Sequence, residues 1–129
     1  MEFRNVDRAR QLVRFDGMVF GNIAPTDIDA LIEYRDRAYI IYELKHGNTE
    51  VPTGQRLAIE RMVNDFERSG KKAVAFVCRQ DTDWNEDVLL ADAIVTSAYW
   101  NGAWHRTSGK TALEQTTLYI NWIIKEDNK

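Results

Sequence analysis

Two apolar segments that carry charged side chains constrain the fold of this chain more than any other feature. The first spans residues 28–34 and contains Asp29, and the second spans residues 39–45 and contains Glu43 and Lys45. An ionised side chain is costly to bury unless another charge pairs with it or a metal binds it. The sequence therefore predicts a sheet that uses these charges.

The spacing of the two segments indicates a β-hairpin. Residues 35–37 form a short polar connection of the length that joins two antiparallel strands. If the loop holds three residues, Asp29 lies opposite Glu43, and Asp27 lies opposite Lys45. A loop with an even number of residues would place Asp29 and Glu43 on opposite faces of the sheet. The carboxylates converge only in the first register.

Carboxylates beside an ammonium group suit metal-assisted hydrolysis of phosphodiesters. Hard oxygen ligands favour Mg²⁺ or Mn²⁺, and Mg²⁺ commonly takes one or two carboxylates with water and substrate phosphate. Such a metal lowers the pKa of a bound water, and a neighbouring lysine stabilises the negative charge that develops.

An Asp, a hairpin and then Glu-x-Lys resembles the pattern of the PD-(D/E)xK nuclease superfamily, which has the restriction-endonuclease-like fold. The matching residues are Asp29 (or Asp27), Glu43 and Lys45, and a helix that opens near Gln55 follows them. The resemblance covers roughly residues 23–77.

The resemblance implies a role for each matching residue. Asp29 and Glu43 become metal ligands together with the backbone carbonyl of Leu44. Lys45 orients the attacking water, and Gln55 is an accessory residue.

The match departs from the family pattern at Asp27, because Thr26 separates Pro25 from it. Asp27 and Asp29 therefore compete for one position. Asp29 is preferred, because it falls inside the expected strand and opposite Glu43. The plain structural alternative is a solvent-facing hairpin with a cross-strand salt bridge.

Charge and composition set limits on the partners. The chain has 129 residues and a net charge of −3, which fits a single domain but is not typical of a general nucleic-acid binder. Local basic groups nevertheless flank the motif. Those expected to contact nucleic acid are Arg10, Arg14, His46 and Arg56.

The chain has one cysteine, Cys78, in an apolar run. A lone cysteine excludes an intramolecular disulfide and fits the reducing cytoplasm. The sequence has neither a signal-peptide pattern nor an apolar run long enough to span a membrane, so a cytoplasmic location is expected.

The periodicity of apolar residues predicts an α/β fold, with a mixed central sheet flanked by helices. Residues 73–78 form a continuous apolar run, which is typical of a buried strand parallel to its neighbour. Asn101-Gly102 predicts a tight hairpin. The expected helices are 6–14, 55–68 and 111–125, and the expected strands are 28–34, 39–45, 73–78, 93–100 and 103–107.

We therefore expect an Mg²⁺-dependent nuclease that acts on DNA. A chain of this size leaves little room for a target-recognition domain, which favours a structure-selective or low-specificity endonuclease. A Holliday-junction resolvase of this kind would act as a homodimer, because junction cleavage needs two sites. The alternative is a catalytically inactive module that binds nucleic acid or protein on the same fold.

Overall fold

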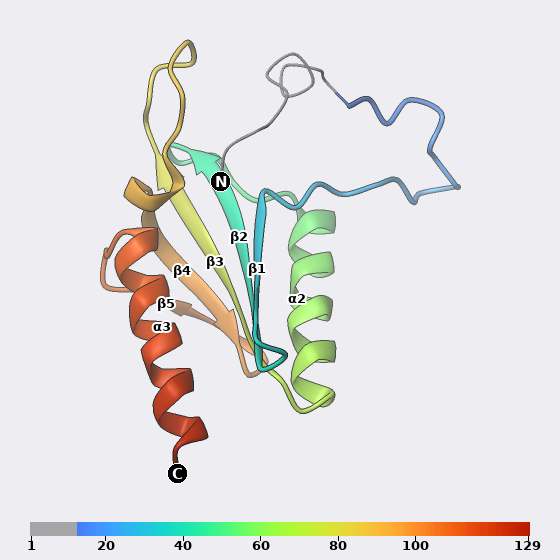
Figure 1. The fold of residues 1–129 in the computed structure, drawn as a ribbon. Coiled ribbons are helices and arrows are strands. Elements are labelled where there is room, and N and C mark those ends of the chain that lie inside the picture. Colours follow the sequence, from blue (N-terminus) through green and yellow to red (C-terminus); the bar gives the residue numbers. More distant parts are fainter. Residues whose placement is uncertain (1–12) are drawn as a thin grey trace.

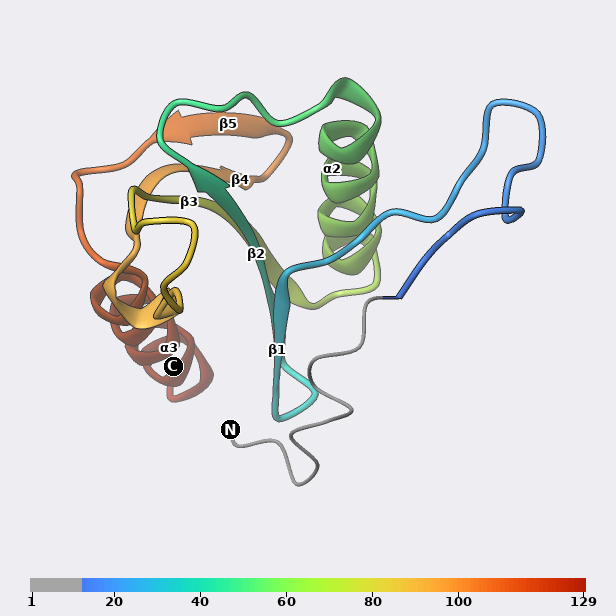
Figure 2. The same ribbon diagram turned by 90° about the horizontal axis from the view of Figure 1, so that it is seen from above.

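The fold is a five-stranded sheet with a helix on each face, seen in a computed structural model that describes residues 13–129 (Figures 1 and 2). This confirms the α/β class and the mixed sheet. The elements in chain order are β1 (Ala30–Tyr34), β2 (Ala38–His46), α2 (Thr53–Arg68), β3 (Lys72–Gln80), the 3₁₀ turn η1 (Leu90–Asp92), β4 (Ile94–Trp100), β5 (Ala103–Arg106) and α3 (Ala112–Asp127).

The strands follow one another across the sheet in the order β1-β2-β3-β4-β5. β2 and β3 are parallel, because α2 crosses between them, and the other neighbouring pairs are antiparallel. Viewed from above, α2 and α3 lie on opposite faces of the sheet (Figure 2).

The central strands β2 and β3 are apolar on both faces because a helix covers each face. Ile41 and Ala75 belong to the cluster that packs under Ile59 and Val63 of α2. The opposite face of these strands packs toward α3 in a second cluster. That cluster includes Ile40, Tyr42, Val74, Phe76 and Cys78, with Tyr119 and Ile120 of α3 against it.

The β1–β2 hairpin has the register that the three-residue loop predicts. Tyr34 pairs with Ala38 and Ala30 pairs with Tyr42. Arg35 and Asp36 adopt φ values of 49° and 59°, which closes the loop within three residues. β1 is shorter than expected, because it begins at Ala30 rather than at residue 28.

The helix expected over residues 6–14 lies largely outside the described residues, as does Arg10. Its last two residues, 13 and 14, are described and are not helical. Phe20 and Ile23, farther along, form an isolated antiparallel bridge around a tight turn.

The C-terminal half follows its sequence signals closely. Asn101 and Gly102 have φ values of 50° and 80° and join β4 to β5 in a two-residue turn. α3 begins after Thr111, whose Oγ1 accepts a hydrogen bond from the Glu114 backbone at 3.1 Å. Neither helix of the described residues is long and apolar enough to cross a membrane.

The capping box of α3 yields a stability prediction. Thr111→Ala removes the acceptor for the Glu114 N–H and should lower the free energy of unfolding by about 1 kcal/mol. Urea denaturation followed by circular dichroism measures the change. Thr117→Ala is the matched control, because Thr117 lies inside the helix and bonds only the Leu113 carbonyl. Equal losses in the two variants would contradict the capping role.

The burial of Cys78 yields a second prediction. The side chain is fully buried, and burial, followed by the negative charges of Asp29 and Glu43, raises the pKa of the thiol to about 12. The folded protein at pH 8 should therefore not react with a thiol reagent such as dithionitrobenzoate, whereas the denatured chain should react fully. Rapid reaction of the folded protein would show that β3 opens at this point.

Candidate metal centre

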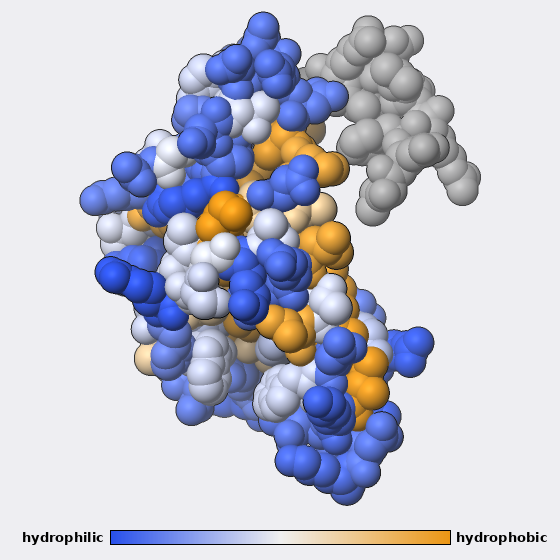
Figure 3. Space-filling model, turned by 90° about the vertical axis from the view of Figure 1, so that its left-hand side faces the viewer, coloured by the Kyte–Doolittle hydropathy of each residue, from blue (hydrophilic) through white to orange (hydrophobic). Residues whose placement is uncertain are grey.

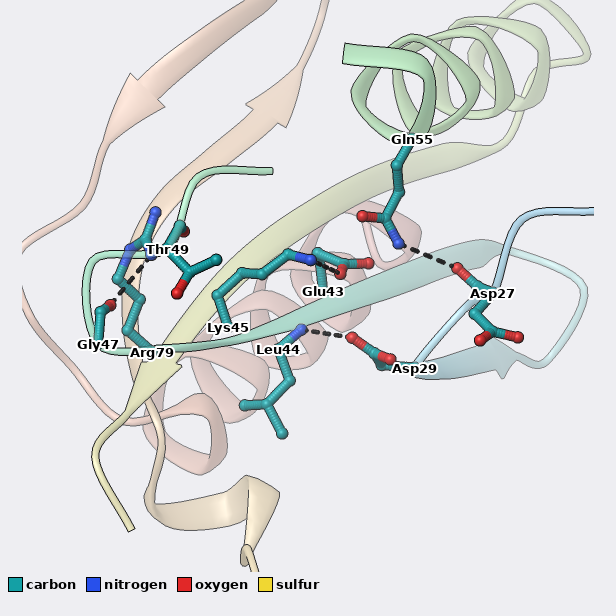
Figure 4. A network of polar contacts seen from close by, with 9 residues as sticks. All are labelled: Asp27, Asp29, Glu43, Leu44, Lys45, Gly47, Thr49, Gln55 and Arg79. Atoms are coloured by element: carbon teal, nitrogen blue, oxygen red, sulfur yellow. Dashed lines mark hydrogen bonds and ion pairs between the residues drawn. The ribbon is translucent and has the colours of Figure 1, made fainter. Parts of the chain in front are cut away.

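Asp29, Glu43, Lys45 and Gln55 lie near one another at one end of the sheet, which we call its carboxyl edge. The carboxyl ends of the parallel strands β2 and β3 lie at this edge, beside the start of β1 and the first turn of α2 (Figures 1 and 4). Ligands in α/β proteins commonly bind at such an edge, because loops and helix N-termini gather there.

Asp29 is held against β2 by a hydrogen bond. Its Oδ2 accepts from the backbone N–H of Leu44 at 2.7 Å (Figure 4). The expectation that Asp29 lies inside the strand is wrong, because β1 begins one residue later. In a longer β1, a backbone carbonyl would accept the Leu44 N–H. Here the Asp29 carboxylate accepts it instead, so the pairing of β1 with β2 ends at this point.

Glu43 is the one charged side chain among the buried polar groups of residues 13–129, and it is only 3% exposed. It lies on the face of β2 that α2 covers. Burial raises the pKa of Glu43 first, and the negative charge of Asp29 raises it further, while Lys45 acts in the opposite direction. The buried carboxylate of Glu43 therefore lies close to the exposed carboxylate of Asp29.

Lys45 lies beside Glu43, on the same face of β2. Its Nζ is 3.2 Å from Glu43 Oε1, and its side chain is 18% exposed. The ion pair therefore holds the ammonium at the rim of the site, with one side reachable by solvent.

Gln55 reaches the site from the first turn of α2. Its Nε2 donates to the backbone carbonyl of Asp27 at 3.3 Å, so the helix is tied to the segment that leads into β1. The carboxylate of Asp27 points away from Glu43 (Figure 4). The geometry thus brings Asp29 to Glu43 and leaves Asp27 as a backbone contact, and Asp27 is not paired opposite Lys45 within β1.

The donor set fits a hard divalent cation. Asp29 and Glu43 supply carboxylate oxygens, and the Leu44 carbonyl leaves β2 on the same side as the Leu44 N–H that Asp29 accepts. Residues 13–129 contain no group of three or more His, Cys, Asp or Glu side chains that could hold a metal ion. Two carboxylates and a carbonyl therefore require water or substrate oxygens to complete the shell, as Mg²⁺ sites commonly do.

Arg79 is a site residue that the sequence reasoning missed. It pairs in register with Lys45 on the parallel strand β3, and its Nη1 donates to the carbonyls of Gly47 and Thr49 at 3.0 and 2.6 Å. Arg79 thus orders the loop that follows β2, and its guanidinium turns toward that loop, whereas the Lys45 ammonium turns toward Glu43 (Figure 4). Lys45 and Arg79 are neighbours only through the parallel register of β2 and β3, which cannot be deduced from the sequence.

The other basic residues expected to contact nucleic acid, His46, Arg56 and Arg14, each have a partner of their own. His46 ends β2, where its Nε2 lies 3.1 Å from the Thr82 carbonyl and its ring stacks on Trp84. Arg56 follows Gln55 on α2 and bonds Glu60 at 3.3 Å. Arg14 is exposed and pairs with Asp16.

A cleft of about 730 Å³ adjoins the site on the side of the β3–β4 loop. Gly47, Asn48 and Arg79 form its near wall, whereas Asp29, Glu43 and Lys45 do not line it. Its far wall is acidic and contains Asp81, Glu86, Asp87 and Asp92. These charges disfavour an anionic ligand on this side of the site.

No family model, curated protein or solved structure matches this chain. A function must therefore be argued from the side chains of the site and their geometry.

The buried charge of Glu43 gives a prediction about stability. Glu43→Gln keeps the shape and removes a carboxylate that lies next to Asp29, so it should raise the free energy of unfolding in EDTA by about 1 kcal/mol. Chemical denaturation measures the change. Glu50→Gln in the exposed loop after β2 is the control and should change little. A large loss in Glu43→Gln would mean that the ion pair with Lys45 outweighs the repulsion.

Proposed function

We propose that this protein is an Mg²⁺-dependent nuclease of the PD-(D/E)xK type that hydrolyses phosphodiester bonds in DNA. One observation carries the proposal: Asp29 is fixed on the Leu44 N–H beside the buried Glu43, and Lys45 lies 3.2 Å from that glutamate. The mixed sheet, with a parallel pair and a helix on each face, is compatible with a restriction-endonuclease-like core.

The carboxylates would hold the metal. Asp29 and Glu43 supply two oxygen ligands, and the Leu44 carbonyl supplies a third. The bound cation would lower the pKa of a water molecule and offset the charge of the scissile phosphate. Like-charge repulsion between Asp29 and Glu43 favours binding, because the cation relieves it.

Lys45 would position the attacking water. Glu43 holds its ammonium at the rim of the site, where the two remaining N–H groups can donate to the water and to a phosphate oxygen. Fixed positive charge at that point stabilises the negative charge of the transition state. Gln55 has an amide within reach of the same region and also ties α2 to the segment before β1.

The site supports a structure-selective or low-specificity endonuclease. The described residues form one compact sheet domain, and Arg56 near the start of α2 offers a contact for the phosphate backbone. Cleavage of a four-way junction would require two copies of this site, and hence a homodimer.

The test is a cleavage assay with Mg²⁺ or Mn²⁺ on linear duplex, supercoiled circle, single strand and four-way junction. Lys45→Ala should lower the rate about 100-fold or more, because it removes a fixed charge at the reacting phosphate. The matched control is Lys71→Ala, since Lys71 pairs with Asp36 at the opposite end of the hairpin at 2.8 Å. It should cleave at the wild-type rate.

Metal binding separates the two aspartates. Asp29→Asn and Glu43→Gln should abolish both cleavage and Mn²⁺ binding measured by calorimetry, whereas Asp27→Asn should retain both. Absence of Mn²⁺ binding and of cleavage in the wild type would overturn the nuclease proposal. Loss of activity in Asp27→Asn alone would overturn the assignment of Asp29.

A further inference from the structure

A second concave surface lies on the face of the sheet opposite Glu43. This groove, of about 790 Å³, runs between α3 and the strands β4 and β5. We call it the aromatic groove, after the rings that line it: Phe76, Trp100, His105, Tyr119 and Trp122. It opens on the side where α3 and β5 lie apart in Figure 2, and Figure 3 views the molecule from that side, where pale and orange side chains lie among blue ones.

The rings of the groove offer exposed faces. Trp100 and Trp122 are 46% and 42% exposed, on opposite walls of the groove. Trp100 is stacked on His105 with ring centroids 4.7 Å apart, and Tyr119 supports Trp122 at 5.7 Å. Each tryptophan thus contacts a neighbouring ring and remains partly exposed.

The charged groups of the groove favour an anionic ligand. The Lys72 ammonium lies 5.2 Å above the Trp122 ring, and Arg106 lines the groove as well. Neither residue makes a salt bridge to residues 13–129. The one acidic lining residue, Glu67, already accepts the Asn101 backbone N–H at 3.1 and 3.2 Å.

We propose that the aromatic groove binds an unpaired nucleic-acid strand, with bases on Trp100 and Trp122 and phosphates near Lys72 and Arg106. Proteins bind single strands by combining a basic groove with aromatic side chains on which bases stack. A duplex keeps its base faces inside the helix, so it cannot offer them to the tryptophans without opening.

The length of the aromatic groove suits a short stretch of stacked bases. Gln115 and Trp122 mark its extent along α3, and seven residues of helix span about 10 Å. That is the length of about three bases stacked about 3.4 Å apart. The inference goes beyond the proposed nuclease activity, because it uses no residue of the metal centre and lies on the other face of the sheet.

The experiment measures fluorescence anisotropy of a labelled single-stranded oligothymidylate in EDTA, where no metal-dependent cleavage occurs. The wild type should bind it more tightly than a matched blunt duplex. Trp100→Ala and Trp122→Ala should each weaken binding about tenfold, because each removes a ring on which a base stacks. Trp100→Phe should restore most of the affinity, since it restores a ring. An oligouridylate in parallel shows whether RNA binds as well.

A salt titration tests the charged part of the groove. Arg106→Gln should reduce the slope of log affinity against log salt concentration by about 0.7, as expected for one lost phosphate contact with a single strand. An unchanged slope together with unchanged affinity would overturn the placement of the phosphates.

Trp84→Ala is the matched control. Trp84 is 85% exposed, more than either tryptophan of the groove, but it lies in a loop with Asp81, Asp83 and Glu86, which repel phosphate. Its removal should leave binding unchanged. Loss of affinity in Trp84→Ala, with none in Trp100→Ala and Trp122→Ala, would overturn the assignment.

Two further outcomes separate this inference from the nuclease proposal. Binding of the oligonucleotide by the wild type, with no cleavage of any substrate by the wild type, would support the groove and contradict the nuclease. Cleavage by the wild type with no contribution from Trp100 or Trp122 to single-strand binding contradicts the groove alone. A dimer in sedimentation velocity that Trp122→Glu dissociates, with no oligonucleotide binding, would make the occupant a second copy of this chain and overturn the inference.

Discussion

The hydrogen bond from the Leu44 N–H to Asp29 is the interaction on which the candidate site depends. It ends the pairing of β1 with β2 and fixes a carboxylate at the carboxyl edge of the sheet. Glu43 precedes Leu44 on β2, so its side chain emerges at the same edge, next to Asp29. If a backbone carbonyl accepted the Leu44 N–H in place of the Asp29 carboxylate, β1 would extend by two residues and this end of the sheet would lose one acidic group.

The rest of the fold gives the surroundings of this contact two different sides. α2 covers one face and brings Gln55 to the edge, while β3 places Arg79 beside Lys45 through its parallel register. The acidic β3–β4 loop repels phosphate on the far side of the edge. Under the proposed function, an anionic substrate would therefore approach from the α2 side.

Under the proposed function, the buried charge of Glu43 sets stability against metal binding. A buried carboxylate next to Asp29 destabilises the folded chain unless Lys45 and a cation offset it. The same desolvation strengthens every electrostatic interaction that the group makes with a ligand. Burial and the negative charges of Asp29 and Glu43 also raise the pKa of the Cys78 thiol on the neighbouring strand β3. The thiol therefore stays protonated and unreactive in the core.

The sequence by itself indicated the five strands and both helices of the described residues, because apolar periodicity and Asn101-Gly102 are local signals. It left the register of the first hairpin open between a loop of three residues and a loop with an even number, and the structure has the three-residue register. The charged positions 29, 43 and 45 were also readable, since ionised residues rarely interrupt apolar strands. Only the tertiary structure decided that Asp29 lies before β1 and that Asp27 turns its carboxylate away, because both depend on a hydrogen bond from another segment. Arg79 and the aromatic groove were likewise decided by packing, since strand order and helix placement bring together residues that are distant in the chain.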